Sequence, residues 1–210
     1  MKKTHLILIS ALIFIMLCGC GEDTDNEKDT DDQSVVTENS SSVSEDNSGI
    51  RPVSSSLTTP LGIDEWGSAA KFSVSMQKYY PVPVRITSVI KGKDAAAKVK
   101  QFMDSSDEYD YKKPEDDYEW ICAEYEMELN DFPTDEGGTD VSITSFVTDK
   151  DGKSIEYDGK IISVTTINMT DDSYYYDGTH KGLIAYTLPE KYSDQILILG
   201  EYNETQAFFK

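Results

Sequence analysis

Histidine and cysteine, which many nucleophilic enzymes and zinc sites need, are scarce in this chain. Its 210 residues include two histidines and three cysteines, which leaves too few of these side chains for most catalytic triads and zinc sites. The sequence also has no glycine-rich phosphate loop, no Gly-x-Ser-x-Gly elbow, no His-Glu-x-x-His motif and no paired Cys-x-x-Cys motifs. We therefore expect a chain without enzymatic activity and without a cofactor.

Positive charge is the second shortage. Lys and Arg total 19 against 39 Asp and Glu, for a formal net charge of -20. A chain this acidic is repelled by phosphate backbones, which excludes nucleic acid as a partner. Hydrophobic residues make up 38% of the chain, which is low for a globular protein, so we expect one part of the chain to stay unpacked.

A long apolar run is also missing. The apolar stretch Leu6–Leu17 follows Met1-Lys2-Lys3, and as a helix it would cover roughly 18 Å of a hydrocarbon core of about 30 Å. A basic start followed by a short apolar stretch is typical of a secretory signal peptide and not of a membrane span.

The stretch ends in Leu17-Cys18-Gly19-Cys20, which resembles a bacterial lipoprotein box. In such a box a small residue, here Gly19, precedes the cysteine that receives diacylglycerol. We predict that residues 1–19 are a lipoprotein signal peptide and that Cys20 anchors the chain to the extracytoplasmic face of a bacterial cell membrane. Two or three acyl chains on this cysteine would keep the protein stably bound to the membrane. The alternative is an ordinary cleaved signal peptide, or an uncleaved anchor, with a chance cysteine.

Residues 20–56 are predicted to form a disordered tether behind the lipidated cysteine. From Gly21 to Ser56 the chain is acidic and rich in serine. Such a segment cannot bury enough apolar surface to offset the entropy of ordering it. We expect it to hold the following domain away from the membrane.

Residues 57–210 are predicted to fold as one β-rich domain. Ile121, Ala123, Tyr125, Met127 and Leu129 alternate with Cys122 and glutamates, the pattern of a half-buried strand. The same reasoning places Val84, Ile86 and Ile90 on one side of a strand and predicts further strands at 72–76, 161–168, 182–188 and 196–199. The last is apolar on both faces and is expected at the centre of a sandwich.

Two connections have local signals. The turn Asp149-Lys-Asp-Gly152 predicts a hairpin between residues 141–148 and 153–157, because Asp-Gly supplies the positive φ of a tight turn. Residues Asp94–Met103 predict a short helix on the sheet, with Asp94 as N-cap and an apolar stripe at Ala95, Val99, Phe102 and Met103.

Short strands separated by turns favour two packed antiparallel sheets, and thus an all-β, immunoglobulin-like sandwich with one short helix. Several segments in order resemble uncharacterised bacterial lipoprotein domains of the immunoprotective-extracellular, immunoglobulin-like (telokin-like) superfamily. The segments are Thr59–Gly62, Ile86–Gly92, Lys113–Tyr125, Asp149–Lys153, Tyr176–Tyr186 and Ala207–Lys210. The resemblance implies a lipid-anchored binding module with no catalytic residues. The chain departs from the pattern at Ile184 and in an acidic insert near residues 104–110.

Candidate binding residues are tyrosines in two clusters, Tyr79-Tyr80 and Tyr174-Tyr175-Tyr176, which we place in loops. Exposed rings there would anchor a surface or extracellular protein, or stack on a glycan; buried rings would pack the sheet edges instead. A protein-binding module predicts an exposed apolar patch rimmed by acids, a glycan binder predicts a pocket lined by tyrosines, and a hydrolase predicts a cleft with convergent carboxylates. We favour the first class, in a monomer.

Other polar residues carry weaker expectations. Asp104, Asp107 and Asp110 could hold a weak calcium ion, although a solvated acidic loop is the simpler interpretation. Asp149 and Asp151 match the start of a calcium-binding loop, but no glutamate follows at the distance that such a loop requires. The predicted turn accounts for these residues instead. Cys122 is expected to be a small buried hydrophobic residue, because His180, expected in a surface turn, is the only mature histidine that could activate it.

Overall fold

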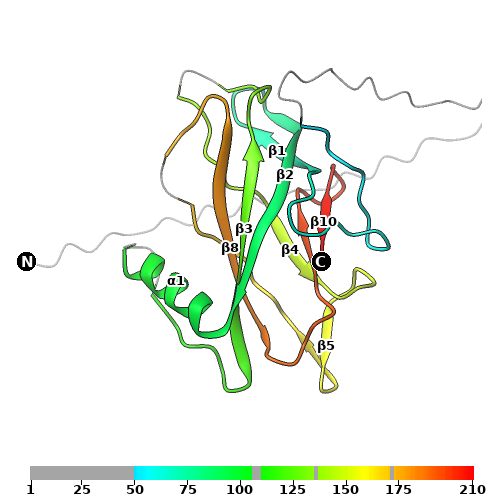
Figure 1. Ribbon diagram of the computed structural model, residues 1–210, viewed down its shortest axis with the longest axis vertical. Coiled ribbons are helices and arrows are strands. Elements are labelled where there is room, and N and C mark those ends of the chain that lie inside the picture. Colours follow the sequence, from blue (N-terminus) through cyan, green and yellow to red (C-terminus); the bar gives the residue numbers. More distant parts are fainter. Residues whose placement is uncertain (1–49, 106–109, 135–136, 171–172) are drawn as a thin grey trace, which may run out of the picture. The chain divides into compact units, whose positions relative to one another are not determined.

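The structure is a computed structural model and describes residues 50–105, 110–134, 137–170 and 173–210. It is built mostly from antiparallel strands with one helix, so the prediction of an all-β fold with a short helix is confirmed (Figure 1). The elements are β1 (Gly67–Ser73), β2 (Lys78–Lys91), α1 (Gly92–Asp104), β3 (Tyr118–Glu128), β4 (Ser145–Thr148), β5 (Ile155–Tyr157), β6 (Lys160–Ile162), β7 (Ile167–Asn168), β8 (Thr179–Pro189), β9 (Ile196–Leu199) and β10 (Ala207–Phe209).

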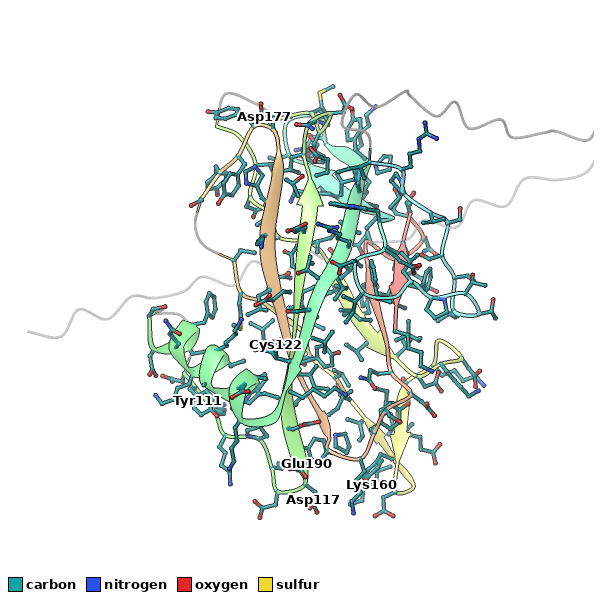
Figure 2. All side chains as sticks on the ribbon, in the orientation of Figure 1. Tyr111, Asp117, Cys122, Lys160, Asp177 and Glu190 are labelled. Carbon is teal, nitrogen blue, oxygen red and sulfur yellow. The ribbon has the colours of Figure 1, made fainter. Side chains whose placement is uncertain are left out.

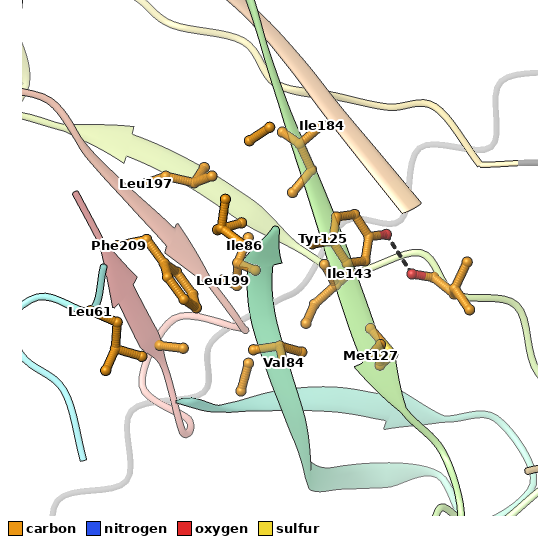
Figure 3. Packing of buried hydrophobic residues seen from close by; sticks show 14 of the residues in the cluster. Leu61, Val84, Ile86, Tyr125, Met127, Ile143, Ile184, Leu197, Leu199 and Phe209 are labelled. Carbon is orange, nitrogen blue, oxygen red and sulfur yellow. Dashed lines mark hydrogen bonds between the residues drawn. The ribbon is translucent and has the colours of Figure 1, made fainter. Parts of the chain in front are cut away.

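Three sheets contain these strands. The largest has five strands in the order β1-β2-β3-β8-β7, a second has three in the order β10-β9-β4, and β5 pairs with β6 alone. The two larger sheets bury their side chains in one core: Val84, Tyr125 and Met127 from the first sheet join Leu199 and Phe209 from the second (Figure 3). Strand β9 is buried at all four positions, which confirms the prediction that both of its faces are covered, and it is the middle strand of its sheet.

Strand β3 confirms the predicted alternation. Every odd-numbered residue from Ile121 to Leu129 belongs to the main core. Its neighbour β8 contributes Gly182 opposite Tyr125, and the Tyr125 hydroxyl donates a hydrogen bond of 2.5 Å to Val141 O. This hydrogen bond joins the centre of β3 to the segment before β4 (Figure 3).

Strand β2 departs from the prediction that Val84, Ile86 and Ile90 share one side. Its pairing with β3 is irregular between Ile86 and Ser88. Such a bulge shifts the alternation by one residue, and Ile90 therefore packs against the helix cluster while Val84 and Ile86 face the main core.

Helix α1 lies on the other face of the five-stranded sheet, as predicted. Ala95, Val99 and Met103 pack with Trp120 and Cys122 in a second, smaller cluster. The predicted cap is wrong: the N-cap is Lys91, with no side-chain hydrogen bond, and Asp94 lies inside the first turn. A carboxylate there still interacts favourably with the positive end of the helix dipole.

The predicted hairpin around Asp149–Gly152 is wrong. The turn forms, with Gly152 at φ 76° and Asp149 Oδ1 accepting hydrogen bonds from the N–H groups of Asp151 and Lys153, but β4 pairs with β9 and β5 with β6. The true hairpin turns at Asp158-Gly159, both at positive φ, which suits the tight turn that β-hairpins prefer. The predicted strand 161–168 is divided between β6 and β7.

The ends of the two larger sheets are joined. On one side Thr166 Oγ1 and Asn168 Nδ2 donate to the carbonyl groups of Ser145 and Ile143. On the other, Gly67 lets β1 approach β10, since a Cβ at this position would lie 2.6 Å from Leu61 Cδ1 and 2.9 Å from Ala207 Cβ. These contacts close the core along both edges of the two sheets.

The boundary expected at Leu57 falls inside a segment that already contacts the strands. Val53 N–H donates to Trp66 O at 2.7 Å, and Ser55 Oγ accepts from Phe208 N–H at 3.0 Å. Cys20, with Leu17 and Gly19 of the predicted lipoprotein box, lies outside the described residues. In the described part of the chain no helix is long and apolar enough to cross a membrane.

Candidate functional site

The clearest candidate site is a groove of about 450 Å³ along the outer edge of β1. We call it the edge groove. One wall is the continuous run Ala70–Ser75, and the other is formed by segments 132–134 and 137–144 with Tyr174. The groove therefore brings together parts of the chain that are up to about a hundred residues apart.

The turn after β1 sets the outer end of the groove. Ser73 Oγ donates to Pro133 O at 2.8 Å and accepts from Met76 N–H at 3.3 Å, and Gln77 takes a positive φ of 54°. The turn points Val74 and Met76 into solvent, with 70% and 53% of their surface exposed. The predicted strand 72–76 is wrong here, because β1 ends at Ser73 and its inward residues are Ala69, Lys71 and Ser73 rather than Phe72.

The floor of the groove holds a buried ion pair. Lys71 is 6% exposed, and its Nζ donates to Asp140 Oδ1 at 2.9 Å and to Ser142 O at 2.8 Å. Burial by itself would raise the pKa of Asp140, but hydrogen bonds from Lys71 and Ser142 and the charge on Lys71 outweigh it and keep this pKa below its usual value. A carboxylate is thus held ionised at the floor of the groove.

The backbone of β1 is open toward the groove. Ala70 N–H points away from β2 and donates to Thr205 O at 2.7 Å. Because donors in an antiparallel ladder alternate in direction, the N–H of Phe72 also points away from β2. Among the described residues it has no backbone partner on that side, so the edge can accept another extended segment.

The predicted tyrosines divide between two roles. Tyr79 and Tyr80 lie in β2 and not in a loop: Tyr79 packs edge-on against Phe72 at 5.1 Å, while Tyr80 packs edge-on against Phe132 at 6.3 Å, next to the main core. Burial, then the nearby Glu201 carboxylate, raises the pKa of Tyr79. Tyr80 is therefore mainly structural.

The second tyrosine cluster does lie in a loop. Tyr174 is 64% exposed and lines the edge groove, and Tyr176 is 57% exposed. Tyr175 points inward, stacks on His180 with ring centres 3.7 Å apart and packs against the main core. Of the five candidates, Tyr174 is in the groove and Tyr79 supports its wall through Phe72.

The cysteine and the histidine are far apart. Cys122 pairs with Ala185 while His180 pairs with Met127, which separates them by five positions along the ladder, or about 17 Å at about 3.4 Å per residue. His180 lies in β8, half-buried, and not in a surface turn. Cys122 is wholly buried beneath α1 (Figure 2).

The thiol of Cys122 is expected to resist alkylation in the folded chain. Burial raises its pKa to about 11, so at pH 8 ionisation alone slows its reaction with iodoacetamide about two hundredfold relative to an unfolded thiol of pKa about 8.5. Peptide mass spectrometry in buffer and in guanidinium measures both rates. Equal rates would contradict this burial.

Of the three acidic candidates for a cation site, the structure describes Asp104 and Asp110. Asp104 forms an ion pair with Lys100 at the end of α1, Asp110 is exposed, and Asp107 lies outside the described residues. Within the described ranges no three His, Cys, Asp or Glu side chains are placed to hold a metal ion.

Sequence reasoning missed the edge groove and the Lys71–Asp140 pair. The available signal was a lysine in a stretch that otherwise holds small residues and one phenylalanine, Gly67–Ser73. Comparisons with models of known families, with curated proteins and with solved structures give no match. Fold and site together define a β-rich domain with a groove of mixed polar and apolar lining at an exposed strand edge.

Proposed function

We propose that this chain is a lipid-anchored lipoprotein whose domain binds an extended segment of a protein partner in the edge groove, without catalysis. The observation that carries the proposal is the exposed edge of β1 beside Phe72, Val74 and Tyr174. Strand addition supplies main-chain hydrogen bonds, while alternate side chains of the added strand enter pockets.

The charge of the groove suggests what the partner carries. Asp140 at its floor is paired with Lys71, and the carboxylate of Glu201, which accepts hydrogen bonds from Thr144 and Tyr79, lies nearby. A surface that combines apolar side chains with the nearby carboxylate of Glu201 favours a segment with apolar and basic residues. The domain's acidity also steers such a partner toward it from a distance.

The test of strand addition uses two variants at one position. Phe72→Ala and Phe72→Pro both remove the ring, but only Phe72→Pro also removes the outward N–H. An edge strand tolerates proline at a position whose N–H points away from the sheet. We expect Phe72→Pro to lose at least about tenfold more affinity than Phe72→Ala, in line with about 1.5 kcal/mol for a main-chain hydrogen bond left unmade.

The partner is captured with a photo-crosslinking amino acid. The full-length lipoprotein, expressed in bacterial cells, carries the crosslinker at Val74 in the groove or at Val53, which is 54% exposed and outside it. A product specific to Val74 that is weakened by Phe72→Pro supports the proposal. A glycan adduct at Val74, or equal products at both positions, would contradict it.

Anchoring is tested at Cys20. Mass spectrometry of the membrane-extracted protein is expected to find a diacylglyceryl group on Cys20 and no residues 1–19, and Cys20→Ser is expected to move the chain out of the membrane fraction. An unmodified Cys20 in the native protein would overturn the anchor.

The immunoglobulin-like sandwich and the kinship with immunoprotective-extracellular lipoprotein domains are part of the same proposal. Two antiparallel sheets of five and three strands around one core support it, as does their non-sequential strand order. An experimental structure with a different strand order would remove this support.

A further inference from the structure

A second cavity, of about 500 Å³, lies near the other end of β3 from the edge groove. We call it the lysine pocket. Phe132 of the edge groove follows the end of β3, whereas Tyr118 and Trp120 of the lysine pocket lie at its start. In Figure 2, Lys160 marks this end of the domain and Asp177 the opposite end.

The pocket exists because strand β7 is short. β7 pairs with β8 only at Ala185 and Ile184, so Thr187 lies beyond the end of the fifth strand. Segments 112–115 and 160–163 flank Thr187 and Trp120 there and form the walls of the pocket.

The lining is unusually cationic for so acidic a chain. Lys112, Lys113 and Lys160 line the pocket with a single carboxylate, Glu115. Lys113 Nζ is 3.7 Å from Asp116 Oδ1 in an exposed pair, while Lys112 and Lys160 have no ion-pair partner among the residues that the structure describes. Ser163 and Thr187 add hydroxyl groups.

A buried donor without a partner adds an independent sign of a ligand. Trp120 is 7% exposed, and its indole Nε1 has no hydrogen-bond partner in the described part of the chain. Burying an N–H group unpaired costs free energy that a bound acceptor would recover. Apart from Glu115, every polar side chain that lines the pocket can donate a hydrogen bond.

We propose that the lysine pocket binds a small oxyanion, a carboxylate or phosphate group, between Lys112 and Lys160, with the Trp120 indole N–H as a further donor. Charge-assisted hydrogen bonds from lysine to such anions are stronger than neutral ones. The exposed Ile161 and the ring of Tyr118 give an apolar side to the same pocket, which suits an anion carried on a larger molecule. This site is independent of the edge groove.

The experiment follows the indole N–H of Trp120 by two-dimensional ¹⁵N–¹H NMR of the full chain. The chain has two tryptophans, and Trp66→Phe assigns the two indole peaks. Inorganic phosphate and glucuronate are titrated separately at constant ionic strength, with glucose as the uncharged control. We expect a saturable downfield shift of the Trp120 indole proton with at least one anion and none with glucose.

The variant Lys112→Met with Lys160→Met is expected to weaken this binding at least tenfold. A matched control, Lys153→Met with Lys191→Met, removes the same charge from exposed lysines outside the pocket and is expected to leave the affinity unchanged. Saturation by phosphate alone or by glucuronate alone identifies the anion. No saturable shift with either anion, or equal weakening in both double variants, would overturn the proposal, while the edge groove would be unaffected.

Discussion

Gly182→Ala is expected to lower the free energy of unfolding by about 3 kcal/mol, at the upper end of the range for overpacking a core. A Cβ at position 182 would lie well inside van der Waals contact of Tyr125 Cζ and Oη. The ring cannot move aside cheaply, because it is wholly buried and its hydroxyl is bonded to Val141 O. Denaturant unfolding followed by circular dichroism measures the loss.

A matched substitution and a double variant separate this clash from a general cost of alanine. Gly62→Ala meets only Glu65 at ordinary distances of 3.6 Å or more, so its effect should stay within about 0.5 kcal/mol. In a Tyr125→Leu background Gly182→Ala should cost much less than alone, since neighbouring changes that share one clash are not additive. Full additivity would show that Gly182 has another role.

Asp140→Ala is expected to destabilise the domain by about 3 kcal/mol, whereas Lys71→Met should cost less than about 1 kcal/mol. Removing Asp140 leaves the Lys71 ammonium buried without a counter-charge, with Ser142 O as a hydrogen-bond acceptor and the Phe132 ring 5.8 Å away, and an uncompensated buried charge is costly. Removing Lys71 leaves Asp140, whose side chain is 40% exposed and can be solvated. Equal losses in the two variants, measured by denaturant unfolding at pH 7, would contradict this asymmetry.

The acid dependence of stability checks the same pair. The pKa of Asp140 is lower in the folded chain than its usual value, so its contribution is fully present above the unfolded pKa of about 3.9 and is lost as the pH falls through the folded value. Below about pH 4 the wild type should therefore lose more stability than Lys71→Met does. Equal losses of stability in the two proteins would show that other carboxylates determine the acid dependence.

Local sequence patterns predicted the elements whose burial depends on one strand or helix. The alternation from Ile121 to Leu129 and the apolar run Ile196–Leu199 each carry their own periodicity, and both were confirmed. The stripe of α1 was also predicted, because residues three and four apart share a helix face. Strand pairing could not be predicted in this way: Asp-Gly occurs at 151–152, 158–159 and 177–178, and only Asp158-Gly159 forms the two-residue turn of a hairpin.

The sequence by itself determined an acidic, β-rich chain with few catalytic residue types, since composition and short-range periodicity need no partner. Tertiary structure alone decided the bulge that turns Ile90 toward α1, the burial of Lys71 against Asp140, and the placement of Phe72 and Tyr174 in the lining of one groove. Each depends on residues tens of positions apart. Their proximity follows from strand order and register, which are settled by how whole faces bury together and not by any local pattern.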